Sequence, residues 1–318
     1  MQFSWIKLGQ IFDVRDVQDR WFMKEFAQAP STLVRDDYVR VFFSTRPLPD
    51  HLGQYKSYST FLDLDRNDLT RIVRIGEEPL LPLGALGAFD EFGVYPFSAV
   101  DCGNKVVGYY GGWTRCRSVP FNVSIGFAES YDNGETFKRI GGGPVLGPSA
   151  EEPFVISGPK IRWLNGLFVL YYIAGHMWIL DDGRPEPLYS IRMATSTDGQ
   201  DWDRHNRDLI PRKLGFNEAQ ASPDVFFLNN QYHMFFCFRH GTNYRGNNRG
   251  YRLGYAWSND MINWNRNDIM SDLTTSAVGW DSESVSYPHV FELDGDIYML
   301  YLGNGVGRNG FGLAIMRK

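Results

Sequence analysis

Residues 222–237 read Ser-Pro-Asp-Val-Phe-Phe-Leu-Asn-Asn-Gln-Tyr-His-Met-Phe-Phe-Cys. A proline precedes a short apolar run, a polar turn follows, and a strongly aromatic segment ends the stretch. The same arrangement recurs at intervals of 66, 63, 64 and 65 residues, around Pro30, Pro96, Pro159, Pro223 and Pro288. Short runs rich in β-branched and aromatic residues favour strands over helices. Five repeated units, each beginning with a pair of strands, are therefore predicted.

Each unit continues with further strand signals. The aromatic second strands are expected at 39–43, 106–110, 168–172, 232–236 and 297–301. Third strands are expected at 124–128, 191–194, 253–256 and 311–314, followed by turns rich in Ser, Asp, Asn and Gly. Such residues bind their own backbone and accept positive φ angles. Fourth strands open with an aromatic residue, a spacer and a base, at 137–139, 202–204 and 264–266.

The fifth unit reaches Lys318 after its third strand, and the missing pattern occurs at Trp5-Ile6-Lys7. A strand from the N-terminal end can complete the last blade and close a ring, which removes an open sheet edge. The sequence therefore predicts an all-β protein, a five-bladed β-propeller with four-stranded antiparallel blades. We expect residues 1–318 to form one domain.

The composition narrows the classes of function. The chain has 318 residues, 43% hydrophobic and 15% aromatic, with a net charge of −5. The sequence has no basic run of the kind that indicates nucleic-acid binding, and no apolar run is long enough to span a membrane. Three cysteines without metal-ligand spacing, Cys102, Cys116 and Cys237, and the lack of a signal pattern favour a cytoplasmic protein. The oligomeric state is left open.

A carboxylate precedes four of the repeat prolines by five positions, as Glu25, Glu91, Glu218 and Glu283, and Asp90 adjoins one of them. A repeated position can carry a turn or capping residue. Alternatively, the carboxylates converge on the central funnel, where like charges raise one another's pKa and supply an acid and a base. Glycoside hydrolysis requires such a pair.

Other side chains near the expected strand ends suit a carbohydrate ligand. Aromatic rings at Tyr95, Trp113, Trp178, Tyr189 and Tyr287 could stack on sugar faces, or could pack between blades. Arg46, Arg239 and Asn304 follow second strands, and Arg239 with Arg245 could hold a phosphate or a sugar carboxylate. His176, His240 and His289 lack zinc-ligand spacing, so no metal site is predicted.

Several motifs together resemble an uncharacterised subgroup similar to glycoside hydrolase family 43, in the five-bladed superfamily that also holds family 32. The motifs are AQAP (27–30), FFSTR (42–46), GAFDEFGVYP (87–96), SGPKI (157–161), EAQASPDVF (218–226), YRLGYAWSNDMINW (251–264), WDSESVSYPHVF (280–291) and YLGNGVGRNGFGLA (301–314). The resemblance implies a funnel-shaped active site and a carbohydrate substrate, and subgroup members often occur among genes for bacterial surface-polysaccharide synthesis. By analogy it also allows a calcium ion in the channel, although no residue pattern here requires a cofactor.

The chain departs from that superfamily at the residues before the repeat prolines, where characterised enzymes usually have an Asp. Here these residues are Ala29, Tyr95, Gly158, Ser222 and Tyr287. The resemblance instead carries over Gln28, Arg46, Asp90, Glu218, Arg239, Glu283, Tyr287 and Asn304, of which Asp90, Glu218 and Glu283 form the expected catalytic carboxylate set. The predicted function is a glycoside hydrolase acting on a bacterial poly- or oligosaccharide. A phosphorylase or glycosyltransferase on the same fold and a non-catalytic glycan-binding propeller are the alternatives.

Overall fold

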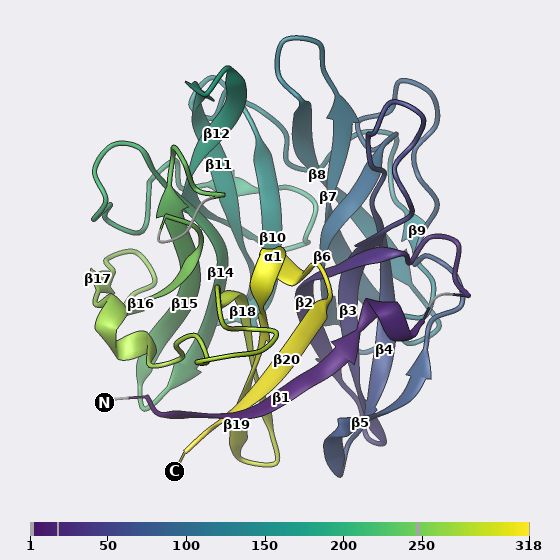
Figure 1. The fold of residues 1–318 in the computed structure, drawn as a ribbon, viewed down its shortest axis with the longest axis vertical. Coiled ribbons are helices and arrows are strands. Elements are labelled where there is room, and N and C mark those ends of the chain that lie inside the picture. Colours follow the sequence, from purple (N-terminus) through teal and green to yellow (C-terminus); the bar gives the residue numbers. More distant parts are fainter. Residues whose placement is uncertain (1–2, 18, 246–248, 318) are drawn as a thin grey trace.

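A computed structural model describes residues 3–17, 19–245 and 249–317. It contains five four-stranded antiparallel sheets arranged around a central channel, which confirms the predicted five-bladed propeller (Figure 1). Blade 1 contains β2 (Glu25–Val34), β3 (Tyr38–Arg46), β4 (Tyr58–Asp65) and β5 (Asp68–Ile75). Blade 2 contains β6 (Gly93–Asp101), β7 (Val106–Arg115), β8 (Phe121–Ser130) and β9 (Lys138–Arg139).

Blade 3 contains β10 (Ile156–Leu164), β11 (Leu167–Asp181), β12 (Arg184–Ser196) and β13 (Asp203–Arg204). Blade 4 contains β14 (Glu218–Leu228), β15 (Gln231–His240), β16 (Arg252–Ser258) and β17 (Asn265–Arg266). Blade 5 contains β18 (Ser286–Leu293), β19 (Asp296–Leu302), β20 (Gly310–Met316) and, as its outermost strand, β1 (Trp5–Asp13). The N-terminal strand therefore closes the ring as expected, and β1 lies beside β20 in Figure 1.

Within the described residues, helical structure is confined to short segments: η1 (Val14–Asp16), η2 (Asp268–Ser271) and α1 (Asn304–Gly307). No helix in the described part of the chain is long and apolar enough to cross a membrane.

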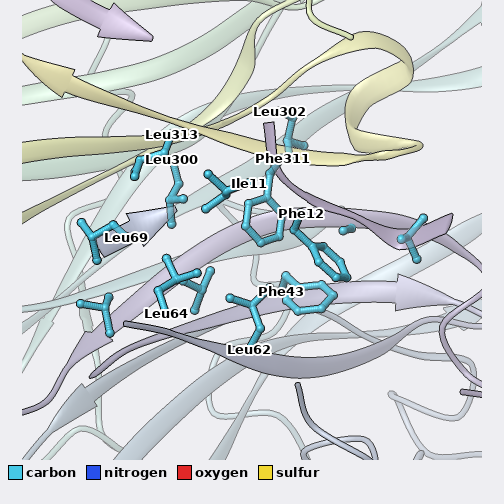
Figure 2. Packing of buried hydrophobic residues seen from close by; sticks show 14 of the residues in the cluster. Ile11, Phe12, Phe43, Leu62, Leu64, Leu69, Leu300, Leu302, Phe311 and Leu313 are labelled. Atoms are coloured by element: carbon cyan, nitrogen blue, oxygen red, sulfur yellow. The ribbon is translucent and has the colours of Figure 1, made fainter. Parts of the chain in front are cut away.

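Apolar side chains fill the spaces between neighbouring blades, as the period of two in each strand requires. Figure 2 shows the cluster between blades 5 and 1, where Phe12 and Phe311 pack on Phe43 and Leu300 is fully buried. Similar clusters join blades 1 and 2, 2 and 3, 3 and 4, and 4 and 5. Each large apolar side chain buried in this way contributes about 1.5–3 kcal/mol.

The first strand of each blade lines the channel, and each first strand contacts the next around the ring. Every first strand has a register irregularity at its repeat proline, for example between Ser157 and Lys160 in β10 and between Ala221 and Asp224 in β14. The extra residue of such a bulge reorients neighbouring side chains. The bulges therefore decide which side chains face the ligand space.

Candidate active site

A cavity of about 470 Å³ lies at one end of the channel. Two long hairpins, β7–β8 and β11–β12, supply much of its wall and extend beyond the blades at the top of Figure 1. First strands supply its floor through the five residues that precede the repeat prolines, Ala29, Tyr95, Gly158, Ser222 and Tyr287. The position before each repeat proline is thus the position that faces the cavity.

Four of these five floor residues have positive φ angles, namely Ala29 (51°), Gly158 (63°), Ser222 (50°) and Tyr287 (52°). A residue other than glycine in this region costs on the order of 1–3 kcal/mol, which the surrounding structure must offset. Such strain concentrates at functional sites, so the backbone independently points to this cavity.

The cavity wall is strongly cationic. It includes Arg46, Arg115, Lys160, Arg184, Arg239 and Arg245, whereas Glu186 is the sole carboxylate among its described lining residues. Arg184 and Arg245 both pair with Glu186, and Arg115 pairs with Asp50 at 2.8 Å. For Arg46 and Arg239, no carboxylate partner is found in residues 3–17, 19–245 and 249–317. The cavity therefore carries uncompensated positive charge.

Tyrosine rings surround Arg239 instead of a carboxylate. Its guanidinium carbon lies 3.7 Å from the Tyr244 ring centre, 5.5 Å from that of Tyr189 and 5.6 Å from that of Tyr251. Arg239 also donates to the Pro187 carbonyl at 3.1 Å, and its buried Nε has no hydrogen-bond partner. This cage fixes the guanidinium and leaves its charge available to a ligand.

Arg46 lies in a second aromatic cage on the blade 1 side of the cavity. Its guanidinium carbon is 4.6 Å from the Phe26 ring centre, 5.3 Å from that of Tyr55 and 5.8 Å from that of Tyr95. The buried Nε of Arg46 also has no hydrogen-bond partner. Two cations held in this way suit an anionic ligand group.

The floor tyrosines Tyr95 and Tyr287, and Tyr251 packed against Tyr287, are neutral hydrogen-bond donors at physiological pH. Burial raises the pKa of Tyr95, and burial raises the pKa of Tyr287 and of Tyr251 well above the ordinary value. Tyr189 and Tyr251 form a hydroxyl–hydroxyl hydrogen bond. Phenol hydroxyls and ring faces together can bind the hydroxyl groups and apolar faces of a sugar.

Six of the nine residues predicted to bind substrate line this cavity: Arg46, Tyr95, Trp113, Tyr189, Arg239 and Tyr287. The other three lie outside its lining. Gln28 is buried and donates to the Val306 carbonyl, Trp178 packs against Phe121, and Asn304 accepts from the Glu283 backbone N–H. These contacts give Gln28 and Asn304 a local structural role. Binding by the six cavity residues stays a prediction.

The expected convergence of Asp90, Glu218 and Glu283 on one cavity does not occur. None of them lines the cavity, Asp90 and Glu218 are completely buried, and Glu283 is exposed. Asp90 pairs with Arg139 at 2.6 Å and accepts from the Tyr110 hydroxyl at 3.0 Å. Their catalytic role stays a prediction, and their placement does not support it.

The buried carboxylates instead form a repeated link within each of four blades. A carboxylate before or at the start of the first strand pairs with a base on the outermost strand, as Asp90–Arg139, Glu152–Arg204, Glu218–Arg266 and Asp281–Lys7. In three of these blades a second-strand tyrosine hydroxyl also donates to the carboxylate, from Tyr110, Tyr172 and Tyr301. The base is the one that ends the aromatic-spacer-base pattern. Of the four carboxylates that precede a repeat proline by five positions, Glu218 is the one that forms this link, and its geometry agrees with the turn or capping interpretation.

A polar cluster that the sequence did not predict lies in the channel next to the cavity floor. Lys160, Asp224 and His289 each follow a repeat proline, and all three are buried. His289 Nδ1 lies 2.6 Å from Asp224 Oδ2, and Arg162 also pairs with Asp224. The repeat could have indicated this cluster, because the residue directly after the proline is ionisable in three of the five units.

The channel residues do not fit the calcium ion allowed by analogy. Asp224 is already bound by Arg162 and His289, and the Lys160 Nζ is 4.0 Å from its Oδ2. In the part of the chain that the structure describes, no group of three or more His, Cys, Asp or Glu residues is placed to hold a metal ion.

Comparison with known proteins identifies relatives along the whole chain. The uncharacterized proteins Rv1502 and MT1551, from two strains of Mycobacterium tuberculosis, are each 33% identical over 315 residues, which is 99% of this chain and 100% of theirs. The chain belongs to the family of these proteins. A beta-1,2-mannobiose phosphorylase of Thermoanaerobacter sp. (strain X514) is 24% identical over 162 residues, 48% of this chain and 52% of its own. No protein-family model matches the chain.

Solved structures of glycoside hydrolases share the five-bladed fold of this chain. A glycoside hydrolase superposes with a TM-score of 0.75 over 99% of this chain and 92% of its own, at 14% identity. A thermostable family-43 glycoside hydrolase gives 0.63 over 93% and 89%, also at 14% identity. A GH130 structure, from a family of mannoside phosphorylases that contains β-1,2-mannoside hydrolases, gives 0.65 over 93% and 85% at 14% identity. At such identities the likeness shows the fold.

Proposed function

We propose that this protein is a glycan-active enzyme that transfers a glycosyl group between a sugar hydroxyl and phosphate, a glycoside phosphorylase. The observation that carries the proposal is the cavity's charge. Arg46 and Arg239 face the ligand space without a carboxylate partner among the described residues, and Glu186 is the sole carboxylate in the described lining. Arginine binds phosphate through paired hydrogen bonds, and the two cages hold the guanidinium groups in place beforehand.

The chemistry of phosphorolysis fits a cavity with few carboxylates. Hydrolysis by an inverting enzyme needs one carboxyl group to protonate the leaving oxygen and a second to activate water. Phosphate is itself an anionic nucleophile and needs no base of this kind. It does need cations that bind it at the face opposite to the leaving group, and such an attack inverts the anomeric centre.

The relatives support a glycan substrate. A protein similar to half of this chain is named as a β-1,2-mannobiose phosphorylase, and the same fold carries both mannoside phosphorylases and glycoside hydrolases. We therefore take a β-linked mannoside as the first substrate to test. Inversion would yield α-mannose 1-phosphate from it.

The reverse reaction offers the most direct assay. The purified protein is incubated with α-mannose 1-phosphate and mannose as acceptor, and released phosphate is measured. The forward reaction uses β-1,2-mannobiose with and without inorganic phosphate, and other aldose 1-phosphates and disaccharides follow. We expect turnover in both directions and none in the forward direction without phosphate. Free mannose formed at the same rate without phosphate would show the glycoside hydrolase that the sequence predicted. Binding without turnover across the panel would favour a glycan-binding propeller.

Arg46→Ala and Arg239→Ala test the phosphate site. A hydrogen bond to a charged group contributes about 1.5–3 kcal/mol, so each variant should raise the KM for phosphate roughly 10- to 150-fold, at about 1.4 kcal/mol per tenfold. Arg71→Ala is the matched control, because Arg71 lies on the outer strand β5 and pairs with Asp65. An unchanged KM in both cavity variants would contradict the proposed site.

A further inference from the structure

Lys160 lies where the cavity floor meets the channel. It is 4% exposed and belongs both to the cavity lining and to the buried polar cluster. Its Nζ donates to the Pro30 carbonyl at 2.8 Å, lies 3.2 Å from His289 Nδ1 and lies 4.0 Å from Asp224 Oδ2. Four first strands, β2, β10, β14 and β18, therefore meet at this one amine.

The hydrogen bonds of His289 fix the position of its proton. The Thr32 backbone N–H donates to His289 Nε2 at 2.8 Å, so Nε2 is an acceptor and carries no proton. Nδ1 therefore carries the proton and donates it to Asp224 Oδ2 at 2.6 Å. Burial lowers the pKa of His289 to about 3, so the ring is neutral at physiological pH. Nδ1 consequently cannot accept a hydrogen bond from the Lys160 ammonium.

The Lys160 ammonium is left with unused donors. One N–H binds the Pro30 carbonyl, His289 cannot accept, and Asp224 is beyond hydrogen-bond distance. No other acceptor for this amine is found in the described part of the chain. Because the residue lines the cavity, a ligand oxygen is the available partner.

The charged surroundings make this proton transferable. Arg162 on the same strand disfavours the ammonium, Asp224 on β14 favours it, and His289 on β18 is neutral. Strand β2 contributes a carbonyl and Thr32, and β6 contributes the uncharged Ser98. Burial is the largest influence and lowers the pKa of Lys160 to about 8. An acid works best when its pKa lies near the working pH.

We propose that Lys160 is a catalytic residue, the proton donor to the leaving glycosidic oxygen. This inference rests on the proposed phosphorolysis. A phosphate oxygen forms a bond to the anomeric carbon, the bond from that carbon to the glycosidic oxygen breaks, and the departing oxygen takes a proton from the ammonium. The hydrogen phosphate proton then returns to the neutral amine. Glycoside and hydrogen phosphate thus become glycosyl phosphate and alcohol without net proton exchange.

Glu186 is less suited to this role. Its carboxylate pairs with Arg184 and Arg245 and accepts from the Tyr244 hydroxyl at 2.6 Å. Arg184 and Arg245 therefore occupy Oε1, and the Tyr244 hydroxyl occupies Oε2. Asp224 and His289 act through Lys160 and are positioning residues, because their own polar atoms bind protein groups.

The test compares two substrates in Lys160→Arg, which keeps a positive charge but cannot release its proton at physiological pH. For β-1,2-mannobiose, whose leaving oxygen needs a proton, we expect phosphorolysis to fall about 10²- to 10⁴-fold. For 4-nitrophenyl β-mannoside, whose leaving group departs as an anion, we expect a small loss. In the wild type, phosphorolysis of the disaccharide should decline above about pH 8 as the ammonium is lost. Thermal unfolding reports whether each variant is folded, and Lys160→Met provides a second variant of similar length.

Equal losses on the two substrates in folded Lys160 variants would overturn the assignment while leaving phosphate-dependent turnover, and hence the proposed function, intact. A change confined to the KM for phosphate would make Lys160 a phosphate ligand and would overturn it equally. Turnover of either substrate by the wild type without phosphate would instead count against the proposed function.

Discussion

Replacing Glu218 by glutamine separates a structural carboxylate from a catalytic one. The Glu218 side chain is fully buried and accepts from the backbone N–H groups of Lys213 and Leu214 at 2.8 Å each, and from Gln220 Nε2 at 2.8 Å. It also pairs with Arg266 at 2.5 Å. Glutamine has the same volume, but its NH₂ group would face donors where a carboxylate oxygen now accepts. The substitution therefore breaks hydrogen bonds and leaves a buried cation.

The expected loss follows from the partners that remain. Removing one member of a buried ion pair typically costs about 3–5 kcal/mol. Arg266 keeps a second partner in Asp268 at 2.9 Å, so the lower end, about 3 kcal/mol, applies. With an unfolding entropy of about 2.1 cal/mol/K per residue, a chain of 318 residues loses about 1.5 °C of Tm per kcal/mol. We therefore expect a Tm about 4–5 °C below that of the wild type.

Calorimetry and phosphate-release kinetics, both at neutral pH, make the comparison. Glu218→Gln should lower the Tm without changing turnover at temperatures well below it, because Glu218 does not line the cavity. Glu283→Gln is the control, since an exposed carboxylate should change stability by no more than about 0.5 kcal/mol. Adding Arg266→Met should recover part of the loss, because it removes the buried cation that has lost its pairing with position 218. Unchanged Tm with abolished turnover in Glu218→Gln would refute this reasoning and restore Glu218 to the catalytic set.

Two further predictions concern the cavity wall and acid stability. A Cβ on Gly93 would lie 1.5 Å from Trp113 Nε1, so Gly93→Ala should displace the indole. We expect this to cost about 1–3 kcal/mol of stability and to weaken glycan binding measured by calorimetric titration. Gly143→Ala is the control, because a Cβ there would have no atom within 4 Å and should change neither stability nor binding. Hydrogen bonds from Gln220 and from Arg266 hold the pKa of Glu218 below its ordinary value of 4.5, despite the opposing effect of burial. A depressed folded-state pKa stabilises the fold above the unfolded-state pKa, and this stability is lost as the pH falls through the folded-state value. The free energy of unfolding measured in urea should therefore decline below about pH 4.5, and the decline should be shallower in Glu218→Gln.

The fold was predictable because its signal is repeated. Five prolines at nearly constant spacing, each followed by an aromatic strand, fix the number of blades, and the Trp5-Ile6-Lys7 pattern identifies the closing strand. Hydrophobic periodicity determines which residues fill the spaces between blades, and it depends on local spacing alone. Six residues of the cavity lining were also foreseen, because strand ends and their loops meet at one end of a propeller.

The placement of the buried carboxylates could not be predicted in the same way. Acids near the starts of several first strands and bases on several fourth strands were both visible, but a sequence does not show that an acid and a base pair across one blade, as Asp90 and Arg139 do. An acidic residue near the propeller axis has the same position in the sequence repeat whether its side chain faces the axis or packs into its own blade. Distance and burial decide between these roles, and neither is encoded in the period of the repeat.

The bulge at each repeat proline explains why the ligand-facing residues escaped the periodic pattern. In a regular strand, successive side chains point to opposite faces. At the bulge, two neighbours of one proline reach different surroundings: Ser222 faces the cavity, whereas Asp224 faces the buried channel. Lys160 reaches both. The residues on either side of the proline can therefore vary without disturbing the apolar contacts between blades. This separation lets one repeated backbone hold a cationic cavity and a buried acid–base cluster next to each other.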